Sequence, residues 1–149
     1  PKMNVQENVM VYLMQHVYQM NEAREEAHRY LEFVGLIDKM SVYAHGLSTG
    51  QRKRLELARA MASRPKLLLL DEVTGGVDQK TVPELVSLVE RLRTEGTTVV
   101  LIEHNMKVLM SLADHVVALH LGQQIAYGRP QEIQAHKQVI ESYLGASYA

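Results

Sequence analysis

Two short motifs carry side chains suited to phosphate and metal chemistry. The first is the polar turn Leu47-Ser48-Thr49-Gly50-Gln51, which opens a basic helix. The free backbone N–H groups at such a helix start can bind an anion. The second is a run of four leucines that ends in Asp71 and Glu72. Such a run predicts a buried strand with acid groups at its tip. Together the motifs indicate nucleoside triphosphate chemistry.

The two motifs resemble two marks of the ATP-binding cassette (ABC) ATPases. The polar turn is similar to the family's signature motif, usually Leu-Ser-Gly-Gly-Gln, and the leucine run is similar to its Walker B strand. Two further motifs follow in the family's order. Gly75-Gly76-Val77-Asp78 stands at the place of the D-loop, and Glu103-His104-Asn105 stands at the place of the switch histidine. The resemblance covers nearly all of the chain, and residues 48–51 are named the signature turn below.

For the signature turn, the resemblance implies contact with ATP. In the family this turn faces the P-loop of a second subunit, so that ATP lies between two chains. Ser48 and the Gly50 amide, at the positive end of the following helix, are expected to bind the γ-phosphate. Thr49 replaces the family's usual glycine, so its β-carbon could crowd the nucleotide. The alternative interpretation of Ser48 is an ordinary helix cap. The expected nucleotide-binding residues are Ser48, Thr49, Gly50, Gln51 and the D-loop aspartate Asp78.

For the acidic pair and the histidine, the resemblance implies roles in hydrolysis. Asp71 is expected to hold Mg²⁺ through water, and Glu72 is expected to act as the general base on the attacking water. His104 is expected to contact the γ-phosphate and keep that water in line with Glu72. Val73 stands where the family usually has proline. A solvent-exposed acidic turn is the alternative interpretation of the pair. The expected cofactors are ATP and Mg²⁺.

A P-loop, G-x-x-x-x-G-K-[ST], does not occur in the sequence. In a complete cassette its backbone amides and lysine hold the β- and γ-phosphates. Residues 75–81 look similar, but Gln79 occupies the place of the second glycine. We therefore expect the chain to be the C-terminal part of a cassette that begins after the P-loop segment. We also expect no ATPase activity from the chain alone.

Composition narrows the class of protein. The 149 residues, 46% of them hydrophobic, are enough for one ordinary domain with a core. A formal net charge of -1 gives no electrostatic reason for general nucleic-acid binding. The absence of cysteine excludes disulfides and thiolate metal sites. The apolar runs are far shorter than the roughly 18 residues that a membrane-spanning helix needs.

Apolar spacing predicts an α/β fold. One helix is predicted over residues 5–20, and a second is predicted to be capped by Asn21 and to end near Gly35. Ser48 is predicted to cap a helix over residues 49–63. The later elements are a strand at 66–70, a helix at 81–94, a strand at 97–102, a helix at 105–112, strands at 115–119 and 123–127, and a helical tail opened by Pro130. The strand-helix-strand order predicts a parallel pair.

The predicted organisation has two parts. Residues 1–47 form a helical subdomain. Residues 48–149 hold the signature helix, a partial parallel-sheet core and the C-terminal helical tail. The resemblance identifies this architecture as the C-terminal part of an ABC-type P-loop NTPase that lacks the P-loop.

The tail indicates which cassette the chain resembles. Gly128-Arg129-Pro130-Gln131-Glu132-Ile133 and the closing Val139-Ile140-Glu141-Ser142-Tyr143-Leu144-Gly145 are similar to ATP-binding subunits of branched-chain amino acid importers. Lipopolysaccharide-export and urea-import cassettes share much of this pattern. The resemblance implies a partial subunit that binds and hydrolyses ATP to power an importer. Its expected partners are a second ABC ATPase subunit, head to tail, and transmembrane permease subunits that hold it at the cytoplasmic face of the membrane.

Two alternatives belong to other classes of protein. One is a non-catalytic ABC fragment that acts as a docking or structural module, which Thr49, Val73 and the missing P-loop favour. The other is a soluble ABC protein of translation or DNA repair. Long insertions or basic tails would favour the second alternative, and the sequence has neither.

Overall fold

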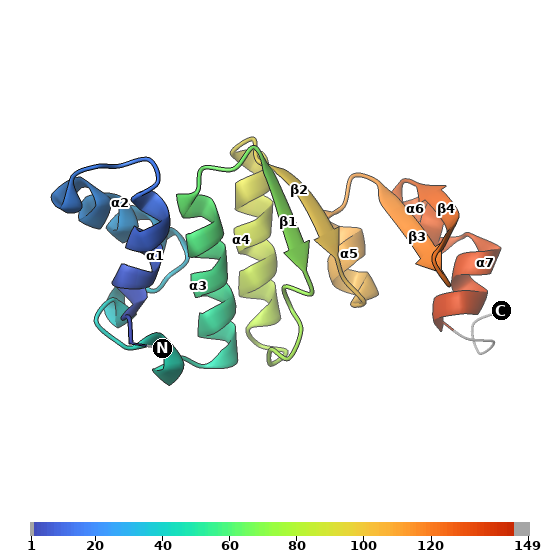
Figure 1. Ribbon diagram of the computed structural model, residues 1–149. Helices are drawn as coiled ribbons and strands as arrows, with labels where there is room; N and C mark the ends of the chain where they lie inside the picture. The colour runs from blue at the N-terminus through green and yellow to red at the C-terminus, as the bar shows by residue number, and fades with distance from the viewer. Residues whose placement is uncertain (1, 145–149) are drawn as a thin grey trace. The chain divides into compact units, whose positions relative to one another are not determined.

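The computed structural model describes residues 2–144 and divides into two compact units, Pro1–Ile102 and Glu103–Ala149. Figure 1 shows the order of the elements along the chain. The predicted boundary after residue 47 falls inside the first unit and stays a prediction. Each helix within residues 2–144 is too short or too polar to cross a bilayer.

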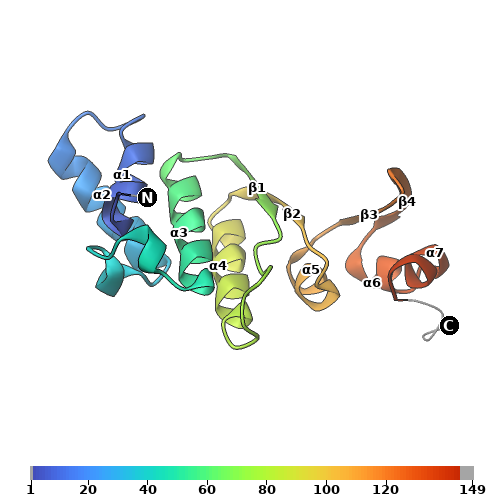
Figure 2. The same ribbon diagram turned by 60° about the horizontal axis from the view of Figure 1, so that its bottom comes forward.

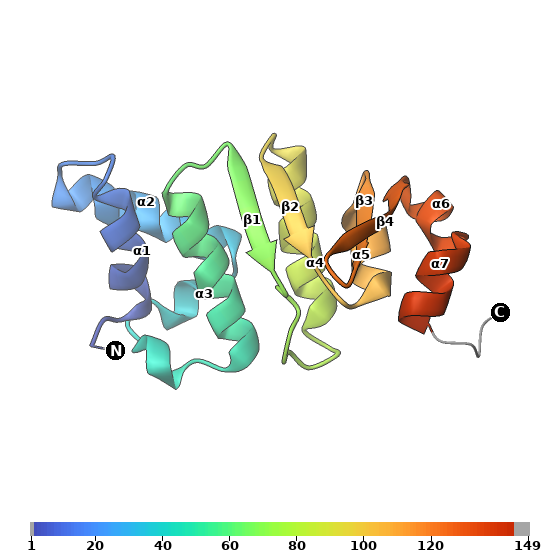
Figure 3. The same ribbon diagram turned by 45° about the vertical axis from the view of Figure 1, so that its right-hand side comes forward.

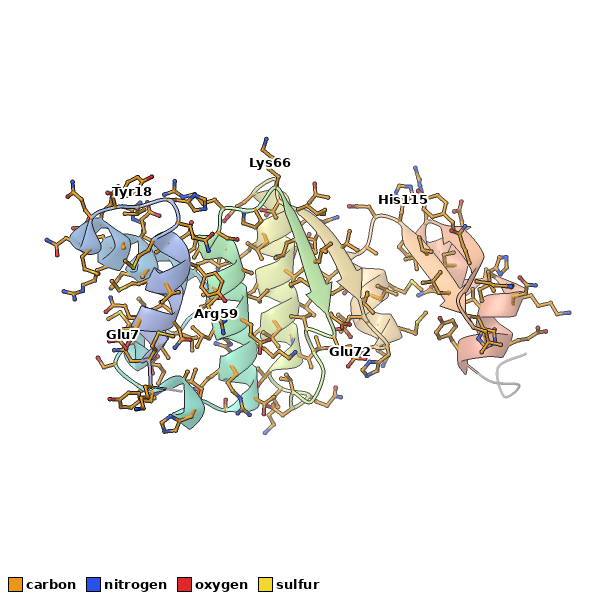
Figure 4. The ribbon with its side chains drawn as sticks, in the orientation of Figure 1. Glu7, Tyr18, Arg59, Lys66, Glu72 and His115 are labelled. Carbon is orange, nitrogen blue, oxygen red and sulfur yellow. The ribbon has the colours of Figure 1, made fainter. Side chains whose placement is uncertain are left out.

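Three helices form the first part of unit one: α1 (Val5–Leu13), α2 (Met20–Phe33) and α3 (Thr49–Ala62). Helix α1 contacts both of the others. Figure 4 shows Arg59 on α3, and this guanidinium donates to the Tyr12 hydroxyl at 2.6 Å while it lies over the Tyr12 ring. The helices share a core of fully buried aliphatic side chains, which includes Val5, Val9, Leu13, Ala23, Ala27, Leu31 and Leu57.

The first predicted helix is too long. Helix α1 ends at Leu13, and the chain turns through residues 14–16, where the N–H groups of His16 and Val17 both donate to the Leu13 carbonyl. Val17 is nevertheless buried, because the turn brings it back to the core. Because Val17 is buried and apolar, the helical spacing of apolar residues continues in the sequence past Leu13, where the helix ends.

The predicted start of the second helix is also wrong, and its predicted end is confirmed. Asn21 lies inside α2, which begins at Met20 after Gln19. At the other end Gly35 has a φ of 69°. The Leu36 N–H donates to the Leu31 carbonyl at 2.8 Å, and the Gly35 N–H donates to the Glu32 carbonyl at 3.0 Å. These two bonds form a Schellman motif, whose left-handed position favours glycine. Two short 3₁₀ turns, Ile37–Lys39 and Ala44–Gly46, then lead to the signature turn.

The second part of unit one is a βαβ unit. Strand β1 (Leu67–Asp71) pairs in parallel with β2 (Thr98–Ile102), and α4 (Val82–Thr94) connects them. The register places Leu67 opposite Thr98 and Asp71 opposite Ile102. Figure 3 shows α4 behind the two strands, with the other face of the sheet toward the viewer. The predicted parallel pair is confirmed.

The prediction that the first strand is buried is wrong for one of its faces. Only the α4 side is covered, and Leu68 is 6% exposed, whereas its neighbour Leu69 is 69% exposed. On β2 the same open face carries Val100 and Ile102, at 50% and 62% exposure. Parallel sheets in α/β proteins normally have both faces covered, so a continuous leucine run is the usual pattern of such a strand. This chain has the leucine run of such a strand, but the described residues of unit one cover only one face of the sheet.

Unit two combines a hairpin with short helices. After α5 (Met106–Leu112), strand β3 (Val116–His120) pairs antiparallel with β4 (Gln123–Gly128). Leu121 and Gly122, with φ of 49° and 76°, form the tight turn between them, as two-residue hairpins require. Helices α6 (Pro130–Gln134) and α7 (Lys137–Val139) and a π-helical turn (Ile140–Leu144) follow. Val116, Ala118, Ala126, Ile133 and Val139 form the core of this unit.

Candidate functional site

The signature turn is a capping box at the start of α3. The Gln51 N–H donates to the Ser48 hydroxyl oxygen at 3.3 Å, and the Ser48 N–H donates to the Gln51 side-chain oxygen at 3.0 Å. Both the helix and its cap are as predicted. The N–H groups of Thr49 and Gly50 lie in the first helical turn, where an α-helix offers no backbone acceptor. The start of α3 therefore carries the partial positive charge that attracts an anion.

Thr49 is exposed at the outer side of this turn. Its hydroxyl accepts a hydrogen bond from the Arg52 guanidinium at 3.2 Å. The threonine and a cation therefore stand together at the helix start. An exposed cation there adds to the positive end of the helix dipole.

Gly50 is buried, and its missing side chain is a packing requirement. A Cβ built at this position would lie 2.7 Å from the Thr81 methyl carbon and 3.6 Å from a methyl carbon of Val77. The first distance is shorter than real Cβ contacts permit. Glycine thus lets the start of α3 approach the loop that precedes α4, a role that the sequence did not reveal.

Removal of the cap is expected to destabilise the chain. Ser48→Ala leaves the Gln51 N–H without its side-chain acceptor, so the free energy of unfolding should fall by about 1 kcal/mol. Urea unfolding followed by circular dichroism measures this change. Ser63→Ala at the other end of α3 is the matched control, because its hydroxyl donates only to the Ala60 carbonyl within the same helix. An equal loss in both variants would contradict a specific cap at Ser48.

Asp71 is the last residue of β1 and Glu72 follows it, at the strand end where they were predicted. Figure 4 labels Glu72 at this end of the strand. Both side chains are exposed. Glu72 has a φ of 47°, in the left-handed region that non-glycine residues rarely occupy. Its N–H donates to the Ile102 carbonyl at 2.8 Å, and its carbonyl accepts from the Gly75 N–H at 2.9 Å. Backbone in such a conformation concentrates at functional sites, where the surroundings hold it in place.

The loop after the acidic pair reaches toward the signature turn. A Cβ at Gly75 would lie 3.1 Å from the Glu72 carbonyl oxygen and 3.4 Å from its carboxylate. A Cβ at Gly76 would lie 3.9 Å from the Thr49 methyl group. Gly76 also has a φ of 68°, which glycine adopts without strain. Unit one therefore places residues 75–76 beside Glu72 on one side and Thr49 on the other.

A hollow of about 180 Å³ lies between α3 and β1, lined by Asp71 and Lys53 among others. Ligand pockets typically measure roughly 300–1,000 Å³, so this hollow is too small to enclose a nucleotide. No cluster of three or more metal-ligating side chains occurs among residues 2–144. One exposed carboxylate is nonetheless compatible with Mg²⁺, which usually binds through one or two carboxylates, waters and substrate phosphates.

Asp78 is a local cap in the loop before α4. One carboxylate oxygen accepts from the N–H groups of Lys80 and Thr81, both at 3.1 Å, and the other accepts from the Thr81 hydroxyl at 2.7 Å. The bond from the Thr81 hydroxyl is the main reason that the pKa of Asp78 lies below its usual value. The carboxylate is therefore kept ionised next to the signature turn.

His104 lies in unit two, in the connection between β2 and α5. Its side chain is exposed. The next residue, Asn105, caps α5 by accepting from the Val108 N–H at 3.4 Å, so the helix predicted at 105–112 begins one residue later, at Met106. The proposed roles of the predicted site residues stay predictions. Within unit one the signature turn and the acidic pair both border the loop of residues 73–81, which contains Asp78.

Sequence reasoning missed two parts of this site. The first is the cap made by Gln51, although Ser48-x-x-Gln51 fits the capping-box pattern and could have been found. The second is Thr81, whose hydroxyl donates to Asp78 and whose methyl group fills the space beside Gly50. An aspartate three residues before a threonine is a local capping signal, but the packing against Gly50 depends on the tertiary fold.

Comparisons with known proteins show the family of the chain. The family model described as "ABC transporter" matches residues 1–75, just over half of the 149-residue chain. The family model described as "Branched-chain amino acid ATP-binding cassette transporter" matches residues 123–149. These two matches lie at opposite ends of the chain.

Individual relatives are similar over most of the chain. BraF of Pseudomonas aeruginosa, a high-affinity branched-chain amino acid transport ATP-binding protein, is 43% identical over 125 residues, which cover 83% of this chain and 49% of BraF. LivG of Escherichia coli, which bears the same description, is 38% identical over 126 residues, which cover 84% of this chain and 49% of LivG. The chain thus spans about half the length of these curated relatives.

The fold is similar to that of solved cassettes. The ADP conformation of MJ1267, an ATP-binding cassette of an ABC transporter, has a TM-score of 0.82 at 27% identity, and the match covers 97% of this chain and 63% of that one. A nucleotide-free cassette has a TM-score of 0.84 at 28% identity, with 95% and 63% covered. From its family model, its relatives and its fold, the chain belongs to the ABC transporter family and is similar to the branched-chain amino acid transport ATP-binding proteins.

Proposed function

We propose that the chain is part of the ATP-binding subunit of an ABC importer of branched-chain amino acids. The observation that carries this proposal is the 43% identity to BraF over 83% of the chain. The match of the last 27 residues, 123–149, to the branched-chain cassette model supports the same substrate class. The cargo itself is inferred through these relatives, since an ATP-binding subunit powers transport without binding the cargo.

The signature turn is the proposed contact with ATP. The N–H groups of Thr49 and Gly50 have no backbone acceptor within α3, and the Ser48 hydroxyl lies at the same positive end of the helix. A P-loop from a second chain would hold the other side of the nucleotide.

The acidic pair is the proposed hydrolytic part of the subunit. Asp71 would hold Mg²⁺, which supplies charge neutralisation on the phosphates when it is bound. Glu72 would accept a proton from the attacking water. The left-handed backbone conformation of Glu72 supports a functional role for this residue. His104 would contact the γ-phosphate and orient the water. Asp78 would connect the two ATP sites through the loop that borders the signature turn.

The proposed partners follow from the family. A second ATPase subunit, assembled head to tail, would supply the P-loop that faces the signature turn. A solved relative, the cassette MJ0796, is described as dimeric in a post-hydrolysis state with ADP and Pi, at 27% identity over 87% of this chain. Permease subunits would hold the assembly at the cytoplasmic face of the membrane, and nucleic acid is not a proposed partner.

The isolated chain is expected to show no ATP turnover, because a P-loop is absent from its sequence. A chimera that carries the P-loop part of a branched-chain importer cassette ahead of Pro1 should show Mg²⁺-dependent ATPase activity. Phosphate release by both purified proteins tests this. Turnover by the isolated chain, or an inactive but folded chimera, would contradict the proposed function. An inactive chimera would favour the alternative of a docking or structural module, which Thr49 in the signature turn also favours.

A further inference from the structure

The starts of helices α3 and α4 lie side by side at one end of unit one, as Figures 1 and 2 both show. Two contacts join these helices. Gly50 packs under the Thr81 methyl group, and one turn further along Arg54 forms an ion pair with Glu84. The first contact includes the signature turn, and the second lies one helical turn away from it.

Thr81 is fixed from its other side by Asp78. Its hydroxyl donates to one carboxylate oxygen at 2.7 Å, and its N–H donates to the other at 3.1 Å. The bond from the hydroxyl selects one side-chain rotamer of Thr81, because a β-branched side chain has few χ1 states. The methyl group is then directed toward Gly50, where a Cβ would come within 2.7 Å of it.

We propose that Thr81 is a positioning residue for the signature turn: Asp78 fixes its hydroxyl, and its methyl group sets where Gly50 and the neighbouring N–H groups stand. The effect of Thr81 on ATP binding rests on the proposed function. Its effect on the position of the signature turn does not depend on that function. In this arrangement Asp78 acts on the signature turn of its own chain, through Thr81.

Two substitutions test the hydroxyl and the methyl group of Thr81 separately. Thr81→Ser keeps the hydroxyl that Asp78 binds and removes the methyl group beside Gly50. Thr81→Val keeps the methyl group and removes the hydroxyl. Both should shift the backbone amide resonance of Gly50 in a ¹⁵N spectrum, and only Thr81→Val should also raise the pKa of Asp78 toward its usual value. The same two substitutions at Thr94, whose hydroxyl donates to the Arg91 carbonyl at the far end of α4, are the controls.

A double-mutant cycle tests the contact directly. Gly50→Ala should lower the urea midpoint of unfolding strongly in the natural background and much less in the Thr81→Ser background, because the blocking methyl group is gone. It should lower the midpoint by the full amount in the Thr94→Ser background. Additive effects of Gly50→Ala and Thr81→Ser, together with an unmoved Gly50 amide in both Thr81 variants, would overturn the proposal.

The consequence for nucleotide is measured with an intact cassette subunit as the source of the P-loop. Thr81→Ser should weaken Mg-ATP binding by this mixture by about 2- to 30-fold, the range that one packed contact contributes to coupling, while Thr94→Ser leaves it unchanged. Equal affinity for Thr81→Ser and the natural chain would overturn the role toward ATP. If the natural chain adds nothing to binding, the proposed function fails, and the double-mutant cycle and the amide shift still decide whether Thr81 positions the turn.

Discussion

Glu72→Gln is expected to lower the ATPase rate of the P-loop chimera by about 10²- to 10⁴-fold, the usual contribution of a general base. ATP affinity should stay nearly unchanged, because glutamine keeps the size and most of the polarity of the side chain. Phosphate release at saturating ATP measures the rate, and calorimetry on the same variant measures binding. The exposed position of Glu72 at the strand end leaves it open to an attacking water.

The matched control for this result is Glu95→Gln. Glu95 is also exposed, and it follows the last residue of α4. The same substitution there should leave turnover unchanged. Full activity of Glu72→Gln would show that another group takes the proton from water. A comparable loss in both variants would show that the effect is not specific to Glu72 and would contradict its role as the base.

The second large effect concerns two adjacent leucines of β1. Leu68→Ala is expected to lower the free energy of unfolding of the isolated chain by about 2–5 kcal/mol, because Leu68 is 6% exposed and its removal leaves a cavity. Leu69→Ala should cost less than about 1 kcal/mol, because Leu69 is 69% exposed on the open face of the sheet. Urea unfolding followed by circular dichroism measures both variants.

This pair of leucines also reports on the open face in the longer protein. In the P-loop chimera Leu69→Ala should cost more than in the isolated chain, because parallel sheets are normally covered on both faces. Equal costs for Leu68→Ala and Leu69→Ala in the isolated chain would contradict the described exposure. An unchanged cost of Leu69→Ala in the folded chimera would show that its added part leaves this face open.

Local chemistry explains what could be predicted from the sequence. The Ser48 cap, the Gly35 helix end and the parallel β1–β2 pair all depend on residues near one another in the chain or on a simple element order. Capping and left-handed glycine positions are decided by the backbone within one turn. These features were therefore predicted and confirmed.

The remaining features depend on surfaces that come from elsewhere in the fold. The burial of Leu69 depends on what covers the second face of the sheet, and a run of leucines cannot specify that. The end of α1 was missed because Val17 is buried through a turn and still fits the helical spacing. Thr81 was missed because its contact with Gly50 links residues from two helices.

The central claim is that the signature turn completes an ATP site with the P-loop of another chain. The most direct test is Mg-ATP calorimetry on this chain alone and then mixed with an intact cassette subunit whose own signature serine has been replaced. We predict no binding by this chain alone, and binding by the mixture roughly 10-fold or more tighter than by the altered subunit, since hydrogen bonds to a charged group contribute about 1.5–3 kcal/mol. Ser48→Arg in this chain should abolish the gain. Equal affinity of the altered subunit with and without this chain would contradict the claim.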